Sequence, residues 1–143
     1  MGNSRKIAIA ILLLASASCG NNQCTSVADI EVSELLLISS NKQDYNYCGL
    51  LKKAVKEDEN SIKKLSLLQF YDAVGYDHGS VIVDLILLIG EAKYLDAIND
   101  ITPKEKSTIM GYIDVGLEYG NNPAVKDQTL KTAFPELYAF LNG

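Results

Sequence analysis

The chain has 143 residues, of which 48% are hydrophobic and 22% charged, and this is the size and composition of one globular domain. Its 10 Gly and 3 Pro exclude collagen-like and low-complexity chains. A formal net charge of -5 argues against a nucleic-acid partner, because nucleic acids are bound through a basic surface. We therefore expect a single folded domain that does not bind nucleic acid.

The first 18 residues have the pattern of an export signal. Arg5 and Lys6 form a short positive region, and the apolar run Ile7–Ala15 follows them. Small residues then lead to Cys19. The apolar run is too short for a membrane-spanning helix, which needs about 20 apolar residues. We predict a signal peptide over residues 1–18.

The residues Ser16-Ala17-Ser18-Cys19 resemble the lipobox of bacterial lipoproteins, with Ser16 standing where Leu is usual. The resemblance implies that Cys19 is acylated and becomes the first residue of the mature chain. Residues 19–25 would then form a lipid-anchored tether before a helical domain over residues 26–143. Gly20, rather than Asp, after the modified cysteine implies an outer-membrane lipoprotein that faces the periplasm.

The number of cysteines favours the lipid anchor. If Cys19 carries lipid, Cys24 and Cys48 remain as an even pair, and we expect them to form a disulfide in an oxidising envelope. A loop of this length predicts a stabilisation of roughly 3.5 kcal/mol. The alternative is ordinary cleavage after Ala17, which would give a soluble secreted chain with Cys19 bridged to Cys24 or to Cys48 and one free thiol.

Helical periodicity predicts an all-α fold, either a helical bundle or stacked helical hairpins, with about six or seven helices. Ser26-x-x-Asp29 predicts a capping box at the start of the first helix. The disulfide would then join the first helix to the second. The predicted caps of the second and third helices are Asp44 and either Asn60 or Ser61. Gly75 is expected to end the third helix.

The second half of the chain contains the clearest helix signals. Val81–Ile89 predicts a buried central helix that Gly90 interrupts. Thr102-Pro103-Lys104-Glu105 predicts a capping box with proline in the first turn. The remaining signals are a stop at Gly120, a last helix that starts at Asn122-Pro123, and a kink or break at Pro135.

Few residues could support catalysis. His78 is the only histidine, so a Ser–His–Asp triad would have to use it, and no GxSxG, Walker or HExxH motif is present. Asp84 lies among apolar residues and could belong to a pair of catalytic carboxylates; alternatively it lies on an exposed stripe or bonds a neighbour. We expect no catalytic residues, no metal site and no cofactor.

Gly75-Tyr76-Asp77-His78-Gly79 is the most unusual stretch of the chain, because two glycines enclose an aromatic, an acid and the lone histidine. It predicts a tight connection between helices. Tyr76, Asp77 and His78 are the candidate partner-binding residues, since such a loop presents its side chains to a partner. The alternative is a plain turn in which Asp77 or His78 caps the next helix.

Removal of the signal leaves 11 of the 13 basic residues against 18 acidic ones, which favours a basic partner or simply solubility. In size, export signal and helix content the chain resembles periplasmic immunity proteins. That resemblance implies a non-enzymatic, lipid-anchored module that blocks a basic cell-wall hydrolase of the envelope. The alternatives are a structural or accessory lipoprotein of an envelope complex, or a hydrolase that uses carboxylates around Asp84.

Overall fold

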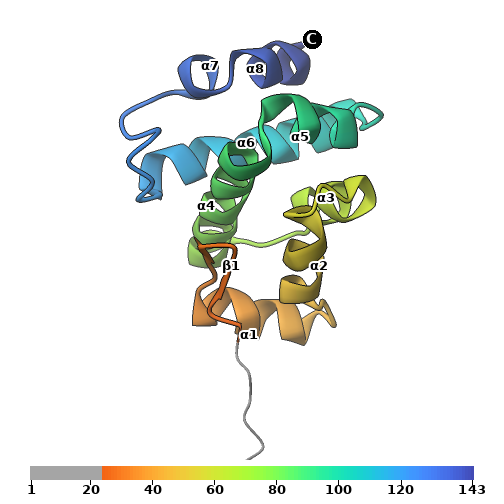
Figure 1. The fold of residues 1–143 in the computed structure, drawn as a ribbon, viewed down its shortest axis with the longest axis vertical. Helices are drawn as coiled ribbons and strands as arrows, with labels where there is room; N and C mark the ends of the chain where they lie inside the picture. The colour runs from red at the N-terminus through yellow and green to blue at the C-terminus, as the bar shows by residue number, and fades with distance from the viewer. Residues whose placement is uncertain (1–23) are drawn as a thin grey trace, which may run out of the picture.

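A computed structural model describes residues 24–143, which form eight helices and one short hairpin (Figure 1). The predicted all-α class is confirmed. The predicted signal peptide and the lipidation site Cys19 lie outside the described residues. The elements are β1 (Ser26–Val27), β2 (Ile30–Glu31), α1 (Glu34–Lys42), α2 (Tyr47–Ala54), α3 (Glu59–Ser66), α4 (Asp72–Ile89), α5 (Glu91–Ile98), α6 (Pro103–Tyr119), α7 (Leu130–Ala133) and α8 (Pro135–Asn142).

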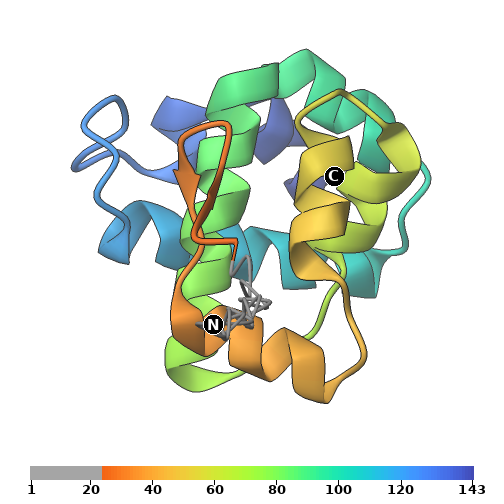
Figure 2. The ribbon, with the colours of Figure 1, turned by 60° about the horizontal axis from the view of Figure 1, so that its bottom comes forward.

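The long helix α4 runs through the centre of the fold, and the other helices are arranged around it (Figures 1 and 2). α1 lies across one end of the molecule, α7 and α8 lie at the opposite end, and α6 crosses α4 between them. The core comes from every helix and from the hairpin. Its fully buried aliphatic side chains include Leu36, Leu51, Ile62, Leu65, Ile82, Leu85, Ile86, Ile98, Ile109, Ile113 and Leu137.

The first predicted helix start is wrong, because residues 26–31 form a two-stranded antiparallel hairpin. Ala28 and Asp29 both have positive φ, at 50° and 65°, as a two-residue type I′ turn requires. The hairpin buries Val27 and Ile30, which pair with each other. The helix starts later, where the Ser33 side chain accepts a hydrogen bond from a backbone N–H in the first turn of α1.

The capping residues of the next helices also differ from the predictions. Asn46 caps α2 and Asp58 caps α3, each accepting from the N–H three residues on, at 2.8 and 2.9 Å. The predicted box at Thr102 is confirmed: Glu105 Oε2 accepts from the Thr102 N–H at 2.7 Å, and Thr102 Oγ1 accepts from the Glu105 N–H at 3.3 Å. The hydrogen bonds that the Thr102 N–H and hydroxyl donate to Glu105 Oε2 lower the pKa of the Glu105 carboxyl.

The predicted turn at residues 75–79 is also wrong, since α4 is continuous through both glycines. The reason is the crossing with α6. A Cβ atom at Gly79 would collide with the Tyr112 backbone oxygen, and one at Gly116 would collide with the Gly79 backbone oxygen. The glycines therefore let two helix backbones touch, and this packing offsets their poor helix propensity of about 1 kcal/mol each.

The break between α3 and α4 lies instead at residues 67–71. Tyr112 on α6 forms hydrogen bonds with the backbone of this segment. Its hydroxyl accepts from the Phe70 N–H at 2.9 Å and lies 3.0 Å from the Leu68 carbonyl oxygen. A side chain from a distant helix thus satisfies polar backbone groups that a continuous helix would have satisfied itself. Burial raises the pKa of this tyrosine.

The helix boundaries predicted in the second half of the chain are confirmed in part. Gly90, with φ of 90°, separates α4 from α5, α6 ends at Gly120, and Pro135 separates α7 from α8. The start predicted at Asn122-Pro123 is wrong. The Asn122 amide side chain accepts from the Ala124 N–H and donates to Asp84 on α4, so this segment is held as a turn.

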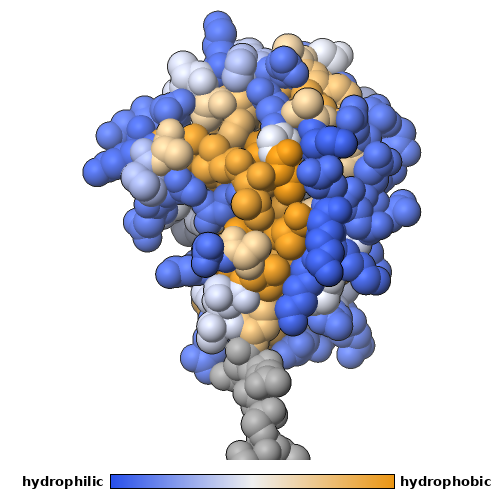
Figure 3. All heavy atoms as spheres, in the orientation of Figure 1, coloured by the Kyte–Doolittle hydropathy of each residue, from blue (hydrophilic) through white to orange (hydrophobic). Residues whose placement is uncertain are grey.

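Apolar surface gathers along the middle of one face, between the hairpin and α2, with hydrophilic surface on both sides (Figure 3). Most apolar side chains of the described chain are nevertheless buried. Among residues 24–143, no helix combines the length and the apolar character that crossing a membrane demands.

Candidate functional site

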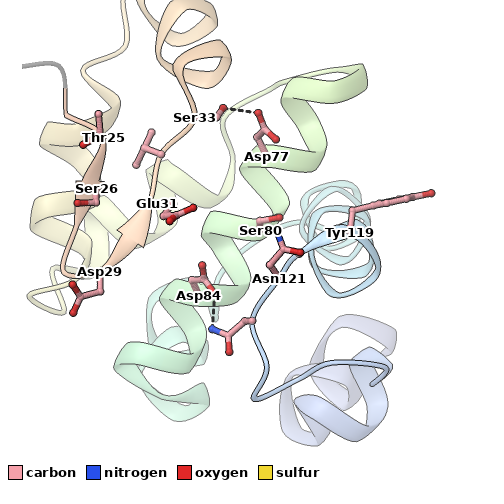
Figure 4. Close-up of a pocket in the computed structure, with 13 residues that line it drawn as sticks. Thr25, Ser26, Asp29, Glu31, Ser33, Asp77, Ser80, Asp84, Tyr119 and Asn121 are labelled. Atoms are coloured by element: carbon pink, nitrogen blue, oxygen red, sulfur yellow. Dashed lines mark hydrogen bonds between the residues drawn. The ribbon is translucent and has the colours of Figure 1, made fainter.

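A polar groove of about 710 Å³ lies along α4, between the hairpin and the segment that follows α6 (Figure 4). One wall comes from the hairpin and the start of α1, the floor from α4, and the other wall from the end of α6 and the turn after it. The lining residues are Thr25, Ser26, Asp29, Glu31, Val32, Ser33, Asp77, Ser80, Asp84, Tyr119, Gly120, Asn121 and Asn122.

The groove is acidic. Its carboxylates are Asp29 and Glu31 from the hairpin and Asp77 and Asp84 from α4. Among the described residues that line it, none is Lys, Arg or His. Carboxylates gathered in a concave site focus a negative potential, which attracts cationic groups.

The helical register of α4 produces the floor of the groove. Asp77, Ser80 and Asp84 are spaced i, i+3, i+7, which places them on one face of the helix. Each acid is tied to a wall: Ser33 Oγ donates to Asp77, and Asn122 Nδ2 donates to Asp84 at 2.7 Å. A carboxylate has about four lone-pair positions, so both acids keep acceptor capacity for a ligand.

Two tyrosines stack near the rim. The rings of Tyr76 and Tyr119 are parallel to within 17°, with centroids 4.8 Å apart, and the residues are 44% and 54% exposed. Figure 4 shows the Tyr119 side chain pointing away from the groove. The neighbouring Glu118 raises the pKa of Tyr119, so this phenol stays protonated at neutral pH. The pair presents an aromatic surface next to the carboxylates.

His78 is not available to a partner, so this part of the predicted binding set is wrong. It is fully buried, and its Nδ1 lies 2.7 Å from the Tyr47 hydroxyl. Phe70, Tyr47 and Tyr112 surround the ring edge to face. Burial lowers the pKa of His78 to about 3, so the imidazole is neutral in the folded protein. A side chain enclosed in this way cannot reach a substrate or a partner.

The other predicted residues lie at or near the groove. Tyr76 is exposed and Asp77 lines the floor, so these two residues are accessible, although they lie on a helix and not on a loop. Asp84 is half-buried and accepts a hydrogen bond from Asn122. This agrees with the alternative in which Asp84 bonds a neighbour.

Cys24 and Cys48 lie at disulfide distance, with Cα atoms 6.3 Å apart. The connection differs from the prediction in one respect. Because residues 26–31 form a hairpin, the pair joins the chain before β1 to α2, and not one helix to another. It fixes the base of the hairpin that forms a wall of the groove.

The sequence did not identify Glu31, Ser33, Tyr119 or Asn122 as groove residues, since only the fold brings them beside α4. The one signal in the sequence is the spacing of Asp77, Ser80 and Asp84, which places them on one face of a helix. Within residues 24–143, no three His, Cys, Asp or Glu side chains are grouped to hold a metal ion. Comparison of the chain with protein-family models, with curated proteins and with solved structures found no match.

Proposed function

We propose that this protein is a lipid-anchored module of the bacterial envelope that binds a basic protein in the acidic groove along α4. The observation that carries the proposal is the lining of the groove, which has four carboxylates on two separate elements and no basic side chain among the described lining residues. A wall and a floor that contribute the same charge favour a ligand that brings the opposite charge.

A Lys or Arg side chain of the partner fits this chemistry. Arginine can donate two parallel hydrogen bonds to one carboxylate, which suits the acids of the groove. The serine and asparagine side chains of the groove supply further donors and acceptors. A volume of about 710 Å³ accommodates one or more long side chains from a protein loop.

The export signal, Cys19 and the cysteine pair support an envelope location. The signal removes two basic residues and no acid, so the mature chain is more acidic than the precursor. A lipid at Cys19 would keep the module at the membrane, and occupation of a basic surface would block or position the partner. Inhibition of a cationic cell-wall hydrolase is the role that best fits this mode of binding.

The test is affinity capture with the tagged full-length chain, solubilised from bacterial envelopes in mild detergent at low salt. The groove variant carries Asp29→Asn with Glu31→Gln, because both side chains are exposed. Asparagine also tolerates the positive φ of residue 29. The matched control carries Asp44→Asn with Asp96→Asn, which removes the same charge from exposed positions outside the groove.

We expect one basic protein to be retained in stoichiometric amount by the unaltered chain and by the control. The groove variant should retain it about tenfold less well or worse, because it leaves the partner's cations unpaired. Retention of no basic protein, or equal retention by both variants, would contradict the proposal.

A further inference from the structure

The end of the molecule that carries α1 exposes large apolar and aromatic side chains. Leu35 and Ile38, spaced i, i+3 on α1, are 47% and 44% exposed. They lie on the opposite side of α1 from the buried Leu36 and Ser40. Tyr71, directly before α4, is 75% exposed. We call Leu35, Ile38 and Tyr71 the basal patch.

The elements that carry the basal patch are held close together. Gln43, just after α1, donates to the Gln69 backbone oxygen at 3.3 Å, and Ser33, just before α1, is bonded to Asp77 on α4. α1 therefore lies beside the first turns of α4, as Figure 2 shows with this end turned forward. The patch comprises three of the six large hydrophobic side chains that are exposed in the described chain.

The described chain also begins at this end. The Thr25 backbone oxygen accepts from the Val32 N–H at 2.9 Å, one residue before the cap of α1. Only four residues separate Cys19 from Cys24. At the maximum reach of a chain, Cys24 would lie within roughly 18 Å of a lipid at Cys19.

We propose that the basal patch rests on the lipid bilayer and orients the domain on the membrane. This inference depends on the lipid anchor of the proposed function. A short tether gives the patch a high effective concentration at the bilayer, so a small apolar contact suffices. Tyrosine is a side chain that membrane interfaces favour. In this orientation the acidic groove opens at the side of the domain and stays accessible.

The charges near the basal patch predict the kind of lipid surface. Glu34, Asp44 and Asp72 are exposed at this end, with Lys42 as the neighbouring base on α1. The contact is therefore apolar and does not depend on anionic lipids. It should persist on neutral phosphatidylcholine and at high salt.

The experiment uses tryptophan reporters, since the chain has no Trp of its own. Leu35→Trp places the reporter in the basal patch. Leu88→Trp is the matched control, because Leu88 is 51% exposed and lies 11 residues beyond Asp77 on α4, roughly 16 Å further along the helix. Each full-length variant is purified from bacterial membranes and reconstituted in vesicles of brominated phosphatidylcholine, which quenches tryptophan fluorescence on contact.

Intact mass and vesicle flotation first report the anchor independently of fluorescence. For an acylated protein that floats with the vesicles, we expect loss of fluorescence from Leu35→Trp and none from Leu88→Trp. Equal fluorescence from both variants, or quenching of Leu88→Trp alone, would overturn the basal contact and leave the anchor intact. A protein without acyl groups would overturn the anchor and the inference together.

Discussion

The two faces of α4 have opposite characters. One face carries Gly79, which touches the backbone of α6, and His78, which lies in an aromatic enclosure. The other face carries Asp77, Ser80 and Asp84, which line an open groove. Close packing limits the size and shape of the side chains on the first face. The second face is defined by its charged and polar side chains. Stability and binding should therefore respond to different substitutions in the same helix.

The largest expected effect is at the helix crossing. Gly116→Ala places a methyl group against the Gly79 carbonyl oxygen, and the two backbones have to separate to accept it. We expect the free energy of unfolding, measured by denaturant titration, to fall by roughly 3 kcal/mol or more.

Gly111 on the same helix provides the control. It is exposed, and a Cβ there would meet nothing within 4 Å. Gly111→Ala should stabilise the protein by up to about 1 kcal/mol, because alanine has the higher helix propensity. Equal effects of the two substitutions would show that the helices do not pack through Gly116.

The next effect concerns the cysteine pair. Replacement of both Cys24 and Cys48 by serine should lower the free energy of unfolding by about 3 kcal/mol. Hydrogen exchange should rise most in the hairpin, which forms a wall of the groove, and least in α6. Unchanged exchange in residues 26–31 would mean that packing of Val27 and Ile30 alone holds the hairpin.

A fall in pH is expected to have an intermediate effect on the free energy of unfolding. His78 is neutral when folded, because its pKa is about 3, whereas an unfolded histidine binds a proton near pH 6.5. The unfolded state therefore binds the extra proton as the pH falls through 6.5, and stability decreases until the pH reaches the folded pKa. Between pH 7 and pH 5 the loss should be about 2 kcal/mol.

A His78→Gln variant tests the origin of that loss. It should be less stable at pH 7, because it repacks the site beside Tyr47, but its unfolding free energy should change little between pH 7 and pH 5. A variant that retains the full pH dependence would place the responsible group elsewhere.

The smallest effect on stability is expected on the groove face. Ser80→Ala should change the free energy of unfolding by less than about 0.5 kcal/mol, since Ser80 bonds only the Tyr76 backbone oxygen of its own helix. Asp84→Asn alters one hydrogen bond to Asn122 and should cost about 1 kcal/mol or less. If either substitution lowered the free energy of unfolding as much as Gly116→Ala, the two faces of α4 would not differ in their contribution to stability.

Local signals in the sequence predicted the features that local chemistry determines. Each of three such features, the capping box at Thr102, the interruption at Gly90 and the break at Pro135, depends only on residues within a single helical turn. All three are present. The same reasoning failed at Gly75 and Gly79. Two glycines so close together predict a turn as long as their packing partners are unknown, and the partner of Gly79, Gly116, lies in a different helix.

The candidate site was predictable only in part. The sequence indicates Asp77 and Asp84 as candidate residues. The acidic groove, however, also needs Asp29 and Glu31, which the hairpin brings opposite them. The prediction for His78 is wrong for the same reason as the predicted turn: in the continuous helix α4, position 78 faces the core. Tertiary packing, which the spacing of residues does not reveal, decided both outcomes.

The most direct test is photocrosslinking in intact bacteria with a benzophenone amino acid in place of Ser80 inside the groove. Ser107, exposed on α6, is the control position. Recognition in the groove predicts one dominant adduct with a basic envelope protein from the Ser80 position and none from the Ser107 position. No adduct at all, or the same adducts from both positions, would contradict it.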